Sequence, residues 1–150
     1  MPIKARWEYH GVYYTTKGSI SAEEIYEARK FMFTPPEGIE PQYQIVDARE
    51  SDKIDLDQME LFNVSADDLA VGRKYPDLKI AFISINKQVE ETFINHFKIS
   101  WSLNTVANIR LFNSVQAARN WINLPYPKSN ENDANGSSAQ NRITLPKDPD

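Results

Sequence analysis

The sequence predicts an α/β domain in which strands and helices alternate over residues 1–124. Segments rich in Val, Ile, Tyr and Phe are typical of strands, and they alternate with segments whose apolar residues recur every three or four positions, as in helices. The connecting segments are long enough to join parallel strands through helices. We therefore expect the order β-α-β-α-β-α-β-α.

The first strand is expected over residues 6–16, where Trp, Tyr, Val and Thr predominate and Gly11 marks a bulge or a turn. A helix should begin after Ser21, because Ser21 and Glu24 have the spacing of a capping box. In that motif each side chain satisfies a free backbone N–H group of the first turn. The prolines at 35–36 should end this helix, since proline has no N–H group to donate.

The second strand is expected at Tyr43–Ala48, because its adjacent apolar residues indicate a strand covered on both faces. A charged loop should follow, and then a helical segment from Asp57 to about Asn63. One or two further helical turns should come next, capped by Ser65 with Asp68.

The third strand, Leu78–Ile85, has the strongest strand pattern in the chain. A helix is expected over Lys87–Lys98, where large apolar residues recur every four positions. Residues Val106–Phe112 should form the fourth strand, and Ser114 should cap the last helix.

The composition changes after Leu124, where four prolines join a run of Asn, Ser, Gly and Asp. Such a segment cannot bury enough apolar surface to offset the entropy lost on ordering, so we expect residues 125–150 to be a disordered tail. Its small apolar patch, Arg142–Leu145, is a weak candidate for a docking motif. The sequence thus predicts one domain, residues 1–124, followed by a polar tail.

Charge and composition exclude several classes of protein. The 17 basic residues are scattered and are outnumbered by 21 acidic ones, which argues against a nucleic-acid partner. There are no cysteines, so neither a disulfide framework nor a cysteine-ligated metal is expected. No segment reaches the roughly 18 apolar residues of a membrane span, and the first residues lack a signal-peptide pattern, so we expect a cytoplasmic protein.

Sequence signatures of catalysis are absent, and we expect neither enzymatic activity nor a cofactor. The five glycines do not form a phosphate-binding loop, and there is neither a G-x-S-x-G nor an H-E-x-x-H motif. The two histidines, His10 and His96, fall in different elements, so we interpret them as structural residues and expect no metal site.

Acidic residues gather between Asp47 and Glu60. Paired carboxylates can perform acid–base chemistry, but the interspersed Arg49 and Lys53 favour solvated charges here. Asp47 is expected to end a strand at the carboxyl edge of the sheet, where open α/β folds bind ligands, so it is the best candidate for a polar contact. Asp57 is expected to cap a helix, with Glu60 completing a capping box.

The order and spacing of several segments resemble the STAS/SpoIIAA-like superfamily, and within it an uncharacterised bacterial branch described as STAS/SEC14-domain proteins. The segments are ISAEEIYEA, YQIVDA followed by IDLDQMEL, PDLKIAFIS and NIRLFNSVQAARNWI, and they span residues 6–122. The resemblance implies a four- to five-stranded, mostly parallel sheet flanked by helices. It also implies a non-catalytic role in binding or signalling.

Anti-sigma-factor antagonists of that superfamily carry an Asp-Ser-Ser-Gly type motif, in which one serine is phosphorylated. In this chain Asp55 matches the aspartate, whereas Leu56 and Asp57 stand in place of the serines and Gln58 in place of the glycine. Asp57 carries one permanent negative charge, which a kinase cannot switch. The resemblance therefore implies a module of this type without its phosphoacceptor.

Two hypotheses of function follow. The first is a protein-interaction or regulatory module, with a protein partner or a second copy of the chain bound at the edge formed by residues 48–57 and the following helix. Its candidate partner surface consists of Asp47, Arg49, Asp55, Asp57 and Gln58. The alternative is a carrier of a small molecule or a lipid-like ligand, which an enclosed pocket of several hundred cubic ångströms would favour. Such a pocket is expected to be lined by Trp7, Tyr14, Phe93 and Trp101.

Overall fold

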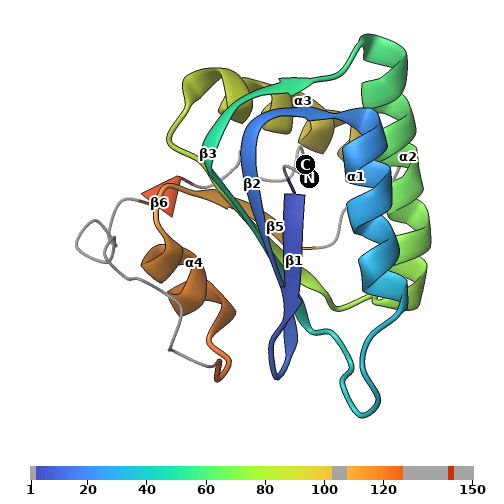
Figure 1. Cartoon of the computed structure of the whole chain (residues 1–150), viewed down its shortest axis with the longest axis vertical. Helices are drawn as coiled ribbons and strands as arrows, with labels where there is room; N and C mark the ends of the chain where they lie inside the picture. Colours follow the sequence, from blue (N-terminus) through green and yellow to red (C-terminus); the bar gives the residue numbers. More distant parts are fainter. Residues whose placement is uncertain (1–2, 103–107, 127–141, 144–150) are drawn as a thin grey trace.

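The computed structural model describes residues 3–102, 108–126 and 142–143, which form three layers (Figure 1). The strands are β1 (Ile3–Trp7), β2 (Gly11–Ser21), β3 (Tyr43–Asp55), β4 (Lys79–Ile83), β5 (Asn108–Phe112) and β6 (Arg142–Ile143). The helices are α1 (Ala22–Lys30), α2 (Gln58–Lys74), α3 (Lys87–Ser102) and α4 (Val115–Ile122), and a short 3-10 helix, η1 (Phe31–Phe33), follows α1.

The strands form one sheet in the order β1-β2-β3-β4-β5-β6, so that neighbours in the chain are neighbours in space. Strands β2 to β5 are parallel, while β1 and β6 are antiparallel to β2 and β5. The predicted α/β class with a mostly parallel sheet is confirmed. The two-residue strand β6 extends the sheet beyond the expected four or five strands.

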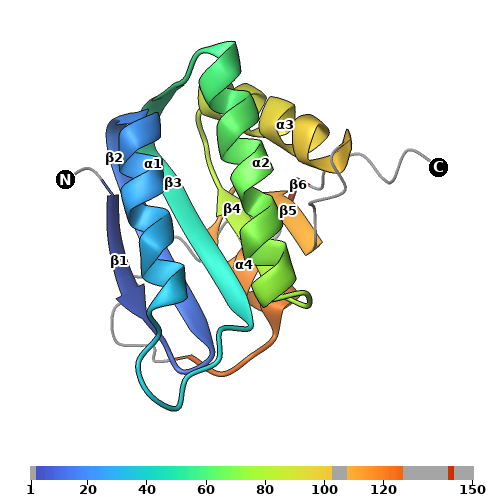
Figure 2. The same ribbon diagram turned by 90° about the vertical axis from the view of Figure 1, so that its right-hand side faces the viewer.

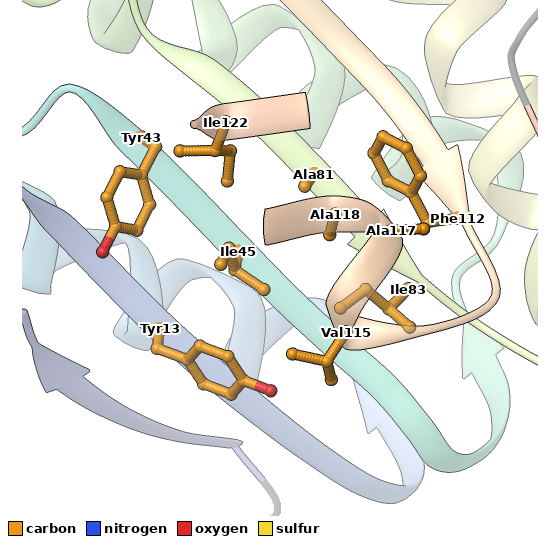
Figure 3. Packing of buried hydrophobic residues seen from close by; sticks show 10 residues of the cluster. All are labelled: Tyr13, Tyr43, Ile45, Ala81, Ile83, Phe112, Val115, Ala117, Ala118 and Ile122. Atoms are coloured by element: carbon orange, nitrogen blue, oxygen red, sulfur yellow. The ribbon is translucent and has the colours of Figure 1, made fainter. Parts of the chain in front are cut away.

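Helices α1, α2 and α3 cover one face of the sheet and α4 covers the other (Figures 1 and 2). Parallel strands joined by right-handed crossovers in sequential order place their helices on the same face. Figure 3 shows the core under α4, where side chains of the helix pack on aromatic and aliphatic residues of the sheet. On the opposite face the core beneath α1–α3 is divided into two clusters, and a cavity lies among their residues.

The first extended region, expected over residues 6–16 with a bulge or a turn at Gly11, is a hairpin of two strands and not one continuous strand. Strands β1 and β2 are antiparallel, and the Glu8 N–H donates to the Gly11 carbonyl at 2.7 Å across the turn. Gly11 lies against the next strand, because an added Cβ would come within 2.3 Å of the Tyr43 carbonyl oxygen. Gly11 therefore permits a close approach of β2 to β3.

Strand β3 continues to Asp55, so the loop expected after Ala48 is wrong. Its first part pairs with both β2 and β4, whereas residues beyond Asp47 pair with β2 alone. In this two-stranded extension Ser51 is buried and Asp52 and Lys53 are exposed. The charged residues resemble a loop in sequence because the extension lacks the continuous apolar run of a central strand.

The predicted helix starts are confirmed at Ser21 and Ser114, whose hydroxyls accept from the backbone N–H of Glu24 and Ala117. The break expected near Ser65 is wrong, because α2 runs without interruption from Gln58 to Lys74. The Ser65 hydroxyl donates to the Leu61 carbonyl at 2.9 Å, within the same helix. A residue of a type that often caps helices is thus accommodated inside one by bonding back to the preceding turn.

Most of the expected tail, residues 127–141 and 144–150, lies outside the described residues. The same holds for residues 106 and 107 of the expected fourth strand. Tyr126 is described, and its ring lies 3.9 Å from the Arg119 guanidinium carbon. Within the described ranges, none of the helices is long and apolar enough to cross a membrane.

Candidate functional site

A cavity of about 150 Å³, partly open to solvent, lies between the sheet and the α1–α3 layer. Its floor is formed by β-strand side chains such as Val46, Ile80 and Phe82, and its roof by residues of the three helices. Val46 and Ile80 stay partly exposed although helices cover this face, because the space above them is not filled. The lining is mostly apolar, and its polar members are Thr16, Arg29, Gln44, Asp68, Thr92 and His96.

Three of these residues form a polar network in the roof, which we call the roof network: Arg29 of α1, Asp68 of α2 and His96 of α3. An Arg29 terminal nitrogen lies 2.8 Å from Asp68 Oδ1, and His96 Nε2 lies 3.0 Å from Asp68 Oδ2. The Ser100 hydroxyl donates to the same Oδ2 at 3.2 Å. Asp68 therefore joins the three helices above the cavity.

The pKa of Asp68 is the net result of opposing effects. Burial raises it, but the hydrogen bond from His96 and the charge of Arg29 more than compensate, so the pKa lies below its ordinary value. Asp68 is thus ionised at neutral pH and accepts hydrogen bonds from each of its neighbours in the roof.

Ser65, His96 and Asp68 have the residue types of a hydrolytic triad, but their placement does not suit catalysis. The Ser65 hydroxyl lies 3.0 Å from His96 Nδ1, and the opposite ring nitrogen faces Asp68. However, Ser65 is fully buried and does not line the cavity. A nucleophile must reach its substrate, so we interpret this serine as support for the His96 ring.

Two of the four residues expected to line a pocket do so, namely Tyr14 and Phe93. Trp7 does not, because its ring stacks on Phe31 at a centroid distance of 5.1 Å. The side chain of Trp101 lies outside the described residues. The pocket is also smaller than the several hundred cubic ångströms expected.

The predicted partner surface is divided between two regions. Asp47 and Arg49 form an ion pair at 2.7 Å, and the Tyr13 hydroxyl donates to Asp47 at 2.8 Å. The prediction that Asp47 ends its strand is wrong, because β3 continues for eight residues to Asp55. At about 3.3 Å per residue, these eight residues place Asp55 at most roughly 26 Å from Asp47, since β3 contains irregularities that shorten this span.

Asp55, Asp57 and Gln58 are exposed at the start of α2. Asp57 is the predicted N-cap: the Glu60 N–H donates to its carboxylate at 2.7 Å, and the Asp57 N–H donates to Glu60 Oε1 at 3.0 Å. The capping box predicted from the spacing of these two residues is confirmed.

Replacing Asp57 with asparagine is expected to change the free energy of unfolding by only a few tenths of a kcal/mol, since both residues cap well. Alanine should cost about 1 kcal/mol, because it leaves the Glu60 N–H without its acceptor. Urea unfolding of both variants measures the difference. A functional loss in the asparagine variant at unchanged stability would show that Asp57 does more than cap the helix.

A second polar network lies on the α4 face, and the sequence offered no signal for it. The Arg119 guanidinium donates to both Glu8 carboxylate oxygens, at 2.7 and 2.8 Å, although 111 positions separate the two residues. The Tyr43 hydroxyl also donates to Glu8. Burial raises the pKa of Glu8, but these hydrogen bonds and the charge of Arg119 lower it below its ordinary value.

The Glu8–Arg119 network is closed to solvent, since Glu8 is 3% and Arg119 6% exposed. It joins the β1–β2 turn, β3 and α4, so we interpret it as structural. In the part of the chain that the structure describes, no group of three or more His, Cys, Asp or Glu residues could hold a metal ion.

No protein-family model and no curated protein matches this chain. Among solved structures, an uncharacterized protein from the DUF3478 family with a SpoIIAA-like fold, from Shewanella loihica PV-4, is similar at a TM-score of 0.48 and 18% identity. The match covers 80% of this chain and 91% of that protein.

Proposed function

We propose that this chain is a non-catalytic binding domain whose cavity takes a small, mostly apolar molecule. The observation that carries the proposal is the cavity beneath α1–α3, in which a largely apolar lining surrounds a few polar groups. Pockets of this composition are the usual binding sites for small molecules, because apolar surface provides affinity and a few polar groups fix orientation.

The roof network supports a binding role over a catalytic one. Its charged groups are already engaged with one another, and Tyr14, which lines the cavity, donates its hydroxyl hydrogen to the Ala28 carbonyl at 3.1 Å. Burial raises the pKa of Tyr14, so this phenol stays protonated at neutral pH. Neither the network nor Tyr14 offers an activated nucleophile or base to a bound molecule.

Filling the cavity tests this proposal. Ala28 of α1 lines the cavity, and Ala28→Phe adds a ring comparable in size to benzene, which a cavity of about 150 Å³ can hold. We expect toluene to perturb the amide resonances of cavity residues in the parent protein. Its affinity should fall at least tenfold in the Ala28→Phe variant.

Ala70→Phe is the matched control, because it makes the same substitution at an exposed position of α2. It should bind toluene as the parent protein does. Equal binding by the Ala28→Phe variant and the parent, or no binding by the parent, would contradict the proposed cavity function. Circular dichroism of both variants establishes that the fold is retained.

A second candidate function, the interaction module, is favoured by the outer α2 surface, which we define as Met59, Phe62 and Leu69. These side chains are 67%, 45% and 39% exposed, while Val64 and Val71 of the same helix are buried. An amphipathic surface helix normally presents polar residues to water, so apolar residues on the outer side favour a covering partner. Asp57 and Gln58 adjoin this surface at the start of the helix.

Phe62→Glu tests the interaction candidate, with a second copy of the chain as the partner. Sedimentation velocity of the parent protein should show a concentration-dependent dimer, whose dissociation constant rises at least tenfold in the variant. Ile85→Glu is the control, since Ile85 is 65% exposed and lies outside α2. A parent protein that remains monomeric at high concentration would exclude the second copy as the partner.

A further inference from the structure

The size of the cavity limits its ligand. A cavity of about 150 Å³ accommodates a single benzene-sized molecule, so a ligand of roughly six to ten non-hydrogen atoms fits. A diacyl lipid is several times larger. The part of the ligand that lies inside this partly open cavity is therefore one ring or one short branched chain.

The charges around the cavity limit the net charge of the ligand. Arg29 and Asp68 are the lining residues with a permanent charge, and they form an ion pair at 2.8 Å. His96 donates to the same carboxylate, so Asp68 already has several hydrogen-bond donors. A charged ligand would bring a charge that nothing in the lining balances, and taking an unbalanced charge out of water is costly.

The floor of the cavity contains one partly exposed polar side chain, Gln44, whose amide faces the cavity without a hydrogen-bond partner among the described residues. Gln44 of β3 lies on the sheet face that α1–α3 cover, among Tyr14, Val46 and Ile80. None of the described residues forms a hydrogen bond with the side-chain amide of Gln44. An amide both donates and accepts, so its natural complement is a group that does the same, such as a hydroxyl or another amide.

On the basis of the proposed cavity function, we infer that the ligand is a neutral molecule of this size with an apolar ring or chain and one hydroxyl or amide group, which Gln44 binds. The observation that carries this inference is a juxtaposition. The Gln44 side chain lies on a mostly apolar floor, and the charges of Arg29 and Asp68 in the roof balance each other. Thr92 of α3 donates its hydroxyl hydrogen to the Gln88 carbonyl at 3.2 Å and so offers only an acceptor to the cavity.

Four probes with a common phenyl ring test the ligand class: toluene, benzyl alcohol, benzoate and benzylammonium. Their affinities for the full chain are measured by NMR titration at pH 7. We expect benzyl alcohol to bind at least tenfold more tightly than benzoate or benzylammonium. Equal or tighter binding of either ion would overturn the inference about charge, while the proposed binding function would stand.

Gln44→Met tests the anchor, because methionine is similar in size and unbranched but cannot form these hydrogen bonds. The variant should lose about 3- to 10-fold in affinity for benzyl alcohol, the effect of one neutral hydrogen bond, and keep its affinity for toluene. Gln42→Met is the matched control at an exposed position two residues earlier. An unchanged preference for benzyl alcohol in the Gln44→Met variant would exclude Gln44 as the anchor. Failure of all four probes to bind would instead contradict the cavity function itself.

Discussion

Replacing Arg119 with methionine is expected to lower the free energy of unfolding by about 3–5 kcal/mol at pH 7, the usual effect of removing one partner of a buried ion pair. The substitution removes both hydrogen bonds from Arg119. The buried Glu8 carboxylate then keeps only the Tyr43 hydroxyl and the partly exposed Arg6 guanidinium at 3.3 Å as partners. Urea unfolding followed by circular dichroism measures the loss.

The pH dependence of stability identifies why the Arg119→Met variant is less stable than the parent protein. In the parent protein the pKa of Glu8 is lowered, so the stability that its ionised form contributes is present at neutral pH and is lost as the pH falls through the folded value. Without Arg119, the pKa of Glu8 should rise relative to the parent protein, because burial is then opposed only by the Tyr43 hydrogen bond and the charge of Arg6. We therefore expect the difference between the Arg119→Met variant and the parent to shrink between pH 7 and pH 4.

A double variant and a surface control complete the test. Combining Glu8→Gln with Arg119→Met removes the buried carboxylate, which only the partly exposed Arg6 would otherwise balance, and should recover at least half of the lost stability. Lys30→Met breaks the exposed Lys30–Glu27 pair and should cost less than about 0.5 kcal/mol. A double variant as unstable as Arg119→Met alone would show that the loss comes from packing and not from a buried charge.

Replacing Asp68 with alanine should produce the second largest effect, a loss of about 2–4 kcal/mol at pH 7. The variant removes the common acceptor of Arg29, His96 and Ser100, and the side chain of Asp68 is only 14% exposed. We place this cost below that of Arg119→Met because water still reaches the roof network and partly screens its charges.

The sign of the pH dependence follows from the lowered pKa of Asp68. The stabilisation that its ionised form provides is present above the ordinary value of 3.8 and is lost as the pH falls through the lower folded value. The parent protein should therefore lose stability below about pH 4 more steeply than the Asp68→Ala variant. Urea midpoints from pH 7 to pH 3 measure this difference.

Asp67→Ala is the matched control, because Asp67 precedes Asp68 on α2 and is exposed. It should change stability by no more than about 0.5 kcal/mol. If Asp67→Ala and Asp68→Ala cost the same, the loss would come from the charge of α2 as a whole and not from the roof network.

Local signals predicted the helix starts well. The caps at Ser21, Asp57 and Ser114 each depend on a hydrogen bond to a residue three positions on, so the sequence contains both partners within one turn. The same local reading failed at Ser65 and after Ala48. At these positions α2 packs on α3 and β3 pairs with β2. These contacts extend both elements past the residues at which short-range patterns predicted their ends.

The candidate site could be predicted only in outline. Aromatic residues suggested a pocket, and two of the four named ones line it. The roof network could not be foreseen, because its Arg29–Asp68 and His96–Asp68 contacts join residues 39 and 28 positions apart on different helices. Nothing in the vicinity of Gln44 in the sequence marks it as a cavity residue, since a polar side chain in a strand is expected to face water.

The α/β class, the alternation of elements from β2 to α4 and three of the helix caps could be predicted from the sequence, because these features depend on composition, periodicity and contacts within a turn. The packing of whole elements placed α1, α2 and α3 on one face of the sheet (Figures 1 and 2). The same packing leaves a cavity between these helices and the sheet. It also decided which charged residues meet inside the protein. Such contacts arise from the packing of whole elements, whose separation along the chain leaves no pattern in the sequence.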